Sequence, residues 1–188
     1  MSALREEDGP RAAGTRAIPG EASGPDVRAF MRAWATGVAV VTGTLGGEPA
    51  GCTVNAFLSV SLRPPLLLVS LADGSRTLAA VAGHGAFGIN VLGWDQRQLA
   101  GRFAGGAARH ADRFAGTPWR MRAGAPVLEG AVAACVCVRE RLIGAADHTL
   151  VLGRPVWTDA GVAAEPGAPV VYHGNRYQPL PSSAGAVP

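Results

Sequence analysis

The feature of this sequence that most constrains its fold is a series of short β-like runs joined by turns. Most neighbouring runs are separated by turn signals such as Gly46-Gly47 and Pro64-Pro65, and few by long helical crossovers. We therefore predict a mostly β fold, an antiparallel barrel with peripheral helices, in place of a doubly wound parallel sheet. The predicted strands are residues 38–44, 50–58, 66–71, 86–92, 131–142, 149–156 and 169–172.

Three short helices are predicted among these strands. The first begins near Asp26, a candidate N-cap, and ends at Gly37; the others span residues 75–82 and 95–103. No helix follows the glycines after residue 42, so the chain lacks a dinucleotide-binding fingerprint.

Domain boundaries follow from composition. Residues 1–24 are predicted as a disordered tail, 25–180 as one domain, and 181–188 as a second disordered tail.

Composition excludes several function classes. The chain holds 17 basic residues, and all of them are arginine. A P-loop lysine and a pyridoxal Schiff base are therefore impossible, and any phosphate must be held by arginine, hydroxyls or backbone N–H groups. The arginines are scattered and the formal charge is only +3, so no nucleic-acid partner is predicted. No run is long enough for a membrane span and no signal peptide is visible, which favours a cytoplasmic protein without a membrane partner.

The thiols and imidazoles of the chain do not form a metal-binding pattern. Cys52, Cys135 and Cys137 lack zinc-site spacing, and we interpret them as small core residues in a reducing compartment. The histidines at positions 84, 148 and 173 are too far apart in sequence to indicate a ligand set. No metal site is predicted.

The stretch from Cys52 to Leu62 alternates between two kinds of side chain. One set is apolar and faces a predicted core, whereas the other carries hydroxyls, an amide and an aromatic ring but no charge. A neutral face of this kind suits a planar heterocycle with N–H and C=O groups, but it also fits an exposed strand rich in serine and threonine. The alternation leaves both open. The uncharged face comprises Thr53, Asn55, Phe57, Ser59 and Ser61.

Three further segments carry candidate binding residues. Ser75-Arg76-Thr77 follows a predicted buried strand and begins a predicted helix. The N–H groups, hydroxyls and guanidinium of this segment suit a phosphate. An ordinary capped helix has the same sequence pattern. Asp147-His148 begins a β-run, and the carboxylate is placed to orient the imidazole. Residues 172–177 gather aromatic rings, a histidine and an arginine; their alternative is a turn with partly buried rings.

Taken in order, these residues resemble the flavin reductase family, the short NAD(P)H:flavin oxidoreductases that partner two-component flavin monooxygenases. The resemblance covers about Val27 to Leu180, and each piece alone is weak whereas the ordered set is specific. The pieces are residues 30–42, 53–61, Pro64-Pro65, Ser75-Arg76-Thr77, 87–92, Arg102-Phe103, Asp112-Arg113-Phe114, Asp147-His148 and 171–174.

The resemblance implies a split β-barrel with a flavin-reductase-like FMN-binding fold, a homodimer, and hydride transfer from nicotinamide to flavin N5, with reduced flavin passing to a monooxygenase. The implied flavin-binding residues are Thr53, Val54, Asn55, Ala56, Phe57, Ser59, Ser61, Ser75, Arg76, Thr77, Phe87, Asn90, Arg102 and Phe103. The implied nucleotide-binding residues are His148, Tyr172, His173 and Tyr177.

Several alternatives stay open at the level of sequence. Relatives often carry a lysine near the phosphate loop, and its replacement by arginine here leaves FMN and FAD both possible. NADH and NADPH are also not distinguished, because no feature reads as a clamp for a 2′-phosphate. The same barrel suits a non-catalytic flavin-binding module or a flavin-dependent oxidase, since fold does not fix function.

Overall fold

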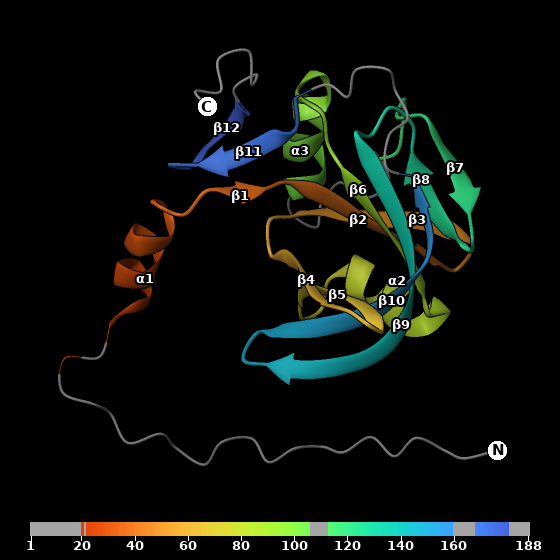
Figure 1. Cartoon of the computed structure of the whole chain (residues 1–188), viewed down its shortest axis with the longest axis horizontal. Coiled ribbons are helices and arrows are strands. Elements are labelled where there is room, and N and C mark those ends of the chain that lie inside the picture. Colours follow the sequence, from red (N-terminus) through yellow and green to blue (C-terminus); the bar gives the residue numbers. More distant parts are fainter. Residues whose placement is uncertain (1–19, 21, 106–112, 160–167, 181–188) are drawn as a thin grey trace.

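The computed structural model describes residues 20, 22–105, 113–159 and 168–180, and most of both predicted tails lies outside them. Its main feature is a seven-stranded antiparallel sheet with the order β3-β2-β6-β9-β10-β5-β4 (Figure 1). The mostly β architecture predicted from the sequence is therefore confirmed. The strands are β2 Ala39–Leu45, β3 Glu48–Val54, β4 Phe57–Leu62, β5 Pro65–Ala72, β6 Ala86–Val91, β9 Ala133–Ala145 and β10 His148–Asp159.

The two edges of this sheet are β3 and β4, which are consecutive in the chain. The long strands β9 and β10 curve around one side, so the sheet bends back toward its own first strand (Figure 1). No ladder joins β3 to β4; the corner residues Asn55 and Ala56 link them, and the Ser70 N–H donates to the Ala56 carbonyl at 3.0 Å. The barrel is therefore split at this corner.

The corner corrects the prediction of one strand over residues 50–58. The alternation of Cys52 to Leu62 continues without interruption in the sequence, but β3 ends at Val54 and β4 begins at Phe57 on the opposite edge of the sheet. Period-two alternation reports which side of a strand a residue occupies, and it carries no information about which neighbour the strand pairs with. The predicted single polar face is thus divided between two places.

Three α-helices accompany the barrel. α1 (Gly24–Met31) begins at Ser23, whose hydroxyl accepts from the Asp26 N–H while the Asp26 carboxylate accepts from the Ser23 N–H. The predicted N-cap at Asp26 is therefore wrong by three positions, because the reciprocal capping box places Asp26 inside the helix. α1 stands away from the barrel and buries no residue (Figure 1).

α2 and α3 lie closer to the cavity described below. α2 (Arg76–His84) is capped by Ser75 and packs against β2. α3 (Arg97–Ala104) follows a single 3₁₀ turn at Trp94–Gln96 and buries Ala100 and Phe103. Within the described part of the chain, no helix is long and apolar enough to cross a membrane.

Two small sheets were not predicted in full. β1 (Thr36–Gly37), β11 (Val170–His173) and β12 (Arg176–Pro179) form one, and the hairpin of β7 (Trp119–Arg122) and β8 (Ala125–Leu128) forms the other. β7 reads Trp-Arg-Met-Arg, an alternation only four residues long, and β12 reads Arg-Tyr-Gln-Pro, which lacks the apolar alternation from which strands are predicted. Their pairing partners decide their conformation.

One buried amide joins the β7–β8 hairpin to the barrel. Asn90 on β6 is fully buried, and its Nδ2 donates to the Val40 carbonyl at 3.0 Å and to the Thr42 hydroxyl at 3.3 Å. Its Oδ1 accepts from the Leu128 N–H of β8 at 2.8 Å. A buried polar side chain is tolerated when its partners are complete, and here those partners fix the hairpin in place.

Candidate functional site

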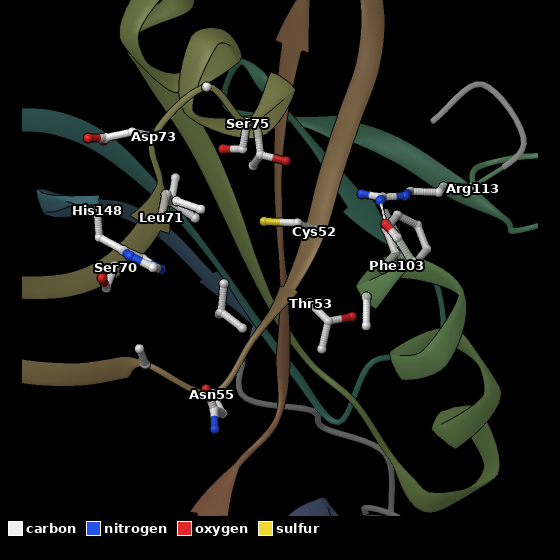
Figure 2. Close-up of a pocket in the computed structure, with 17 residues that line it drawn as sticks. Cys52, Thr53, Asn55, Ser70, Leu71, Asp73, Ser75, Phe103, Arg113 and His148 are labelled. Carbon is white, nitrogen blue, oxygen red and sulfur yellow. Dashed lines mark hydrogen bonds between the residues drawn. The ribbon is translucent and has the colours of Figure 1, made fainter. Parts of the chain in front are cut away.

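A cavity of about 470 Å³ opens at the split in the barrel, a size typical of small-molecule sites (Figure 2). β3 and the corner form one side, the end of β5 and the loop before α2 form another, and the end of α3 with Arg113 forms a third. The described residues that line it are Cys52, Thr53, Val54, Asn55, Ala56, Ser70, Leu71, Ala72, Asp73, Gly74, Ser75, Thr77, Phe103, Ala104, Gly105, Arg113 and His148.

The β3 side offers neutral polar groups. The Thr53 hydroxyl donates to the Ala100 carbonyl of α3 at 2.7 Å, so it ties the helix to the strand. Asn55 lies at the corner, exposed, with its amide at one end of the cavity (Figure 2). An amide supplies both donors and an acceptor, so this end suits a ligand edge that alternates N–H and C=O groups.

The start of α2 lies at another part of the cavity. The Ser75 hydroxyl accepts from the Leu78 N–H at 3.1 Å, and Gly74 takes a φ of 74°, a conformation that favours glycine. The loop is fastened to the β9–β10 turn by two bonds: the Thr149 hydroxyl donates to Asp73 at 2.7 Å, and the Asp73 N–H donates to the Asp147 carbonyl at 3.0 Å. These bonds hold the first turn of α2 against the cavity.

Cys52 lies in the middle of the cavity, between the start of α2 and Arg113 (Figure 2). Burial is the largest influence on the Cys52 thiol and raises its pKa, whereas a hydrogen bond with Thr77 and the charge of Arg113 act in the opposite direction. The thiol therefore stays protonated at neutral pH and behaves as a small apolar group.

Arg113 forms the wall opposite His148. The side chain is almost completely buried, and it donates to the Gly51 carbonyl of β3 at 2.7 Å and to the Gly105 carbonyl after α3. Burial lowers the pKa of Arg113, but a guanidinium remains protonated in proteins at neutral pH. A Cβ at Gly51 would meet Phe103 at 3.1 Å, so the aromatic wall packs directly on the strand.

His148 enters the cavity from the first residue of β10. Its Nδ1 lies 2.8 Å from the Asp147 Oδ1, and Figure 2 shows the imidazole pointing toward the middle of the cavity. The hydrogen bond from His148 lowers the pKa of the Asp147 carboxyl, so the partner stays ionised and fixes which ring edge faces inward. Asp147 itself is exposed at the hairpin turn.

The structure brings eight of the predicted binding residues together and leaves ten elsewhere. Those on the cavity are Thr53, Val54, Asn55, Ala56, Ser75, Thr77, Phe103 and His148. Those outside it are Phe57, Ser59, Ser61, Arg76, Phe87, Asn90, Arg102, Tyr172, His173 and Tyr177. The separation has a distinct cause in each segment.

Phe57, Ser59 and Ser61 belong to β4, beyond the corner. Phe87 and Asn90 point into the core and are fully buried. Arg76 is exposed on the first turn of α2, while Arg102 donates to the Ala115 carbonyl and the Thr117 hydroxyl, away from the cavity. The rings of Tyr172 and Tyr177 contact each other on the small β1-β11-β12 sheet, with centroids 5.5 Å apart and planes tilted by 54°, and His173 is exposed there. For these residues the structure supplies no contact with the cavity.

Sequence reasoning missed several residues that line the cavity. Arg113 follows a segment outside the described residues and has no periodic pattern, although it stands in the Asp112-Arg113-Phe114 piece of the resemblance. For Cys52 the alternation predicts the core face of its strand. Arg113 and Gly51 are 62 residues apart in the sequence. A contact between residues so far apart leaves no local signal in a single sequence.

The arrangement suits a planar, hydrogen-bonding ligand with an anionic group. The hydrogen-bonding groups of the cavity are neutral along β3, and the Arg113 guanidinium and the N-terminus of α2 lie near Cys52. Among the described residues no group of histidine, cysteine and acidic side chains is arranged to hold a metal ion. Neutral donors, a cation and a helix N-terminus in one cavity suit the binding and orientation of a reactive organic cofactor.

Comparison with known proteins agrees with this assignment. The family model described as flavin reductase like domain matches residues 31–181. The chain is 44% identical over 130 residues to a Rhizobium meliloti protein named "Probable flavin reductase", covering 68% of this chain but only 41% of that protein. It is 41% identical over 154 residues to the actinorhodin polyketide dimerase of Streptomyces coelicolor, covering 81% and 84% of the two chains. Against the NADH:FMN oxidoreductase of Rhodococcus erythropolis, identity is 37%, with 96% and 95% covered.

Solved structures give the same result. The NADH:FAD oxidoreductase SgcE6 of Streptomyces globisporus, in complex with NAD and FAD fragments, superposes with a TM-score of 0.77 at 30% identity, covering 91% of this chain and 99% of that one. The styrene monooxygenase flavin reductase of Pseudomonas putida S12 superposes with a TM-score of 0.74 at 32% identity, covering 83% and 97%. The resemblance inferred from the ordered motifs is confirmed.

Proposed function

Because this chain belongs to the flavin reductase-like family, we propose that it is an NADH-dependent flavin reductase that supplies reduced flavin to a separate monooxygenase. The observation that carries the proposal is the cavity at the split of the barrel, with neutral hydrogen-bonding groups on β3 and Arg113 with the start of α2 beyond Cys52. Relatives named as NADH-dependent oxidoreductases and as a monooxygenase flavin reductase support the choice of donor and recipient.

The residues fit a flavin. Asn55 and the backbone at Ala56 suit the pyrimidine edge of the ring, Phe103 gives an apolar wall, and Ser75 and Thr77 lie at the phosphate end. Flavin, when bound, accepts a hydride at N5 from reduced nicotinamide. The protein contributes binding, orientation and exclusion of water, because the flavin itself carries the chemistry of hydride transfer.

His148 is the candidate for the nicotinamide side. Its ring is partly exposed at the cavity mouth and is oriented by Asp147 through the 2.8 Å contact. We expect His148→Ala to raise the KM for NADH roughly tenfold with a smaller effect on flavin affinity, because a misplaced donor binds less well. If the variant instead has a lower melting temperature and an unchanged KM for NADH, His148 has a structural role at the mouth of the cavity.

A steady-state assay tests the proposal directly. Purified protein is mixed with NADH and FMN, FAD or riboflavin, and the loss of NADH absorbance is followed, with NADPH as the parallel donor. We expect NADH oxidation that depends on added flavin, with FMN or FAD preferred to riboflavin. A protein that binds flavin but oxidises neither NADH nor NADPH is a flavin-binding module, and one that needs an organic substrate for turnover is an oxidase.

A homodimer and a cytoplasmic location belong to the same proposal. Leu58, Val60 and Leu62 are exposed on β4, α1 exposes Phe30, and Trp34 is exposed in the segment after α1. Apolar side chains gathered on a sheet edge and on an unpacked helix are typical of an interface between copies. The cytoplasmic location is proposed because NADH is the donor and the three cysteines form no disulfide.

A further inference from the structure

The proposed function leaves one pair of nucleophilic side chains unused. Cys135 and Cys137 are two positions apart on β9, so their side chains lie on the same face of the strand. Cys137 is fully buried in the core, where it packs in one cluster with Phe87 and Ile89. Cys135 packs against the same cluster but is only partly buried. The pair therefore combines one thiol that solvent reaches with one that it does not.

The two thiols are in contact. Their Sγ atoms lie 3.7 Å apart, within the distance at which one thiol hydrogen-bonds to the other. The hydrogen bond from Cys137 is the largest influence on Cys135 and lowers the pKa of that thiol, whereas the same bond and burial raise the pKa of Cys137. Cys135 is thus the thiol that ionises first, and the thiolate is the nucleophilic form of cysteine.

The strand that carries the pair is regularly paired on one side only. Toward β6 the ladder is continuous, and Cys137 lies opposite Phe87. Toward β10 the register shifts between Pro155 and Trp157, directly opposite Cys137 and Val136. Residues two apart on a strand have Cα atoms about 6.6 Å apart, near the upper end of the range that disulfides span. The interrupted ladder lets β9 make the small movement that a bond between the two sulfurs requires.

We propose that Cys135 and Cys137 form a reversible disulfide on exposure to hydrogen peroxide, so that β9 carries a thiol redox site separate from the flavin cavity. Neither cysteine is among the described residues that line that cavity. A bond near the limit of disulfide geometry is readily reduced, and the disulfides of reducing compartments are of this transient kind. Reduced flavin in solution passes two electrons to dioxygen and gives hydrogen peroxide, so the product of the proposed reaction is one source of the oxidant.

The oxidation has two steps. The Cys135 thiolate attacks one oxygen of the peroxide; the S–O bond forms, the O–O bond breaks, and the leaving hydroxide takes up the proton that Cys135 had lost. Cys135 is then a sulfenic acid, oxidised by two electrons. The Cys137 sulfur attacks the Cys135 sulfur, and the S–O bond breaks as the S–S bond forms. The oxygen leaves with the Cys137 proton, so two thiols and one peroxide give one disulfide and two waters.

The test follows the cysteines of the purified full chain in hydrogen peroxide, with no flavin or nicotinamide added. Trypsin cleaves after arginine, so residues 123–139 form one peptide that holds both members of the pair, and Cys52 falls on another. We expect this peptide to lose two hydrogen atoms and to resist iodoacetamide, at a rate at least about tenfold above the oxidation of Cys52, whose pKa is raised by burial. Reduced glutathione should restore both thiols in the folded protein.

Matched alanine substitutions assign the two roles. Cys137→Ala removes the thiol that resolves the sulfenic acid, so dimedone should capture at least about tenfold more sulfenic acid at Cys135 than in the wild type. Cys135→Ala should leave Cys137 reduced, because the buried thiol has lost its partner. Cys52→Ala is the control and should form the disulfide at the wild-type rate. If an alanine variant fails to fold, the wild-type digest decides the question alone.

Three results would overturn the proposal. In the first, the 123–139 peptide keeps two free thiols at a peroxide dose that oxidises an unhindered cysteine peptide, or Cys52 is oxidised before it. In the second, wild-type Cys135 proceeds to sulfinic acid without the disulfide; in the third, glutathione does not reduce the bond. None of these results bears on the proposed function, because the assay contains neither NADH nor flavin. A chain that forms the disulfide but oxidises no NADH would remove the proposed function alone.

Discussion

Residues 52–56 and 57–62 are adjacent in sequence and share one alternating pattern, yet they have opposite surroundings in the fold. The first segment is the β3 end and the corner, and its side chains line the cavity. The second is β4, whose apolar side chains include Leu58 at 51% and Leu62 at 81% exposure. One strand pattern therefore supplies a binding wall on one edge of the sheet and an uncovered surface on the other.

This difference shows that residues on either side of a corner can pack against different elements even when their side chains continue one alternating pattern. At β3 the facing element is α3, to which Thr53 is bonded, and the space left over is the cavity. At β4 the neighbour is β5 and the far side has no covering element among the described residues. The four predictions that follow test whether the two segments are as separate in function as they are in space.

The largest effect is expected on the β4 surface. Replacing both Leu58 and Leu62 with glutamate places unpaired charges in the proposed interface, so we expect the dimer to dissociate, with its dissociation constant raised more than about a hundredfold. The molecular mass is measured by light scattering during size exclusion. Met121→Glu, which places a charge on an exposed apolar side chain of β7 in a different sheet, is the control and should leave the mass of a dimer.

Measuring the FMN affinity of the same double variant tests whether residues 52–56 and 57–62 act independently. If the segments act independently, the monomer keeps its FMN affinity within about threefold, since its own β3 wall is intact. Dissociation accompanied by loss of FMN binding would mean that β4 of one copy completes the cavity of another. A wild-type protein that elutes as a monomer would remove the interface.

The next effect is expected inside the cavity. Cys52→Phe adds a ring where the thiol now borders the space, so FMN affinity should fall at least about tenfold, comparable to the cost of overfilling a packed site. Ser59→Phe makes a comparable increase in size on β4 and serves as the matched control. Melting curves of both variants show whether the fold survives; unchanged FMN affinity in folded Cys52→Phe would place the flavin elsewhere.

A smaller effect separates the polar residues of the two segments. Asn55→Leu removes hydrogen-bonding groups at the corner and should weaken flavin binding by about 0.5–1.5 kcal/mol. Ser59→Val was expected from the alternation to do the same, but its position on β4 predicts no measurable change. Titration of both variants with FMN compares them directly, and an equal loss in the two would restore the single polar face that the sequence suggested.

The smallest effect concerns the reactivity of the Cys52 thiol. Only the thiolate reacts with iodoacetamide, and because burial raises the pKa of Cys52, its alkylation at pH 8 should be slower than that of a free cysteine and should accelerate above that pH. Bound FMN should slow it by a further few-fold. The bond from Cys137 lowers the pKa of Cys135, which provides an internal comparison in the same mass spectrum. Faster labelling of Cys52 in the presence of FMN would contradict the cavity assignment.

Parts of the site were predictable because their signals are local. Ser75 was recognised as the start of a helix, and it caps α2 and borders the cavity. His148 was placed at a strand mouth beside a carboxylate, and its Nδ1 contacts Asp147. Asn90 was assigned to the ligand on the strength of the resemblance, yet it is fully buried and bonded to Val40 and Leu128. A polar residue in a strand has the same sequence pattern in both roles.

The sequence by itself determined the β-rich architecture, the family, and the type of cation available, since alternation, turn residues and the absence of lysine are properties of the chain. Only the tertiary structure decided that the alternating stretch bends at Asn55 and that Arg113, and not Arg76, faces the cavity. The physical reason is range. Strand and helix signals arise from neighbours within a few residues, whereas the cavity is formed by β3, β5, α2 and α3, whose packing depends on contacts made across the whole sheet.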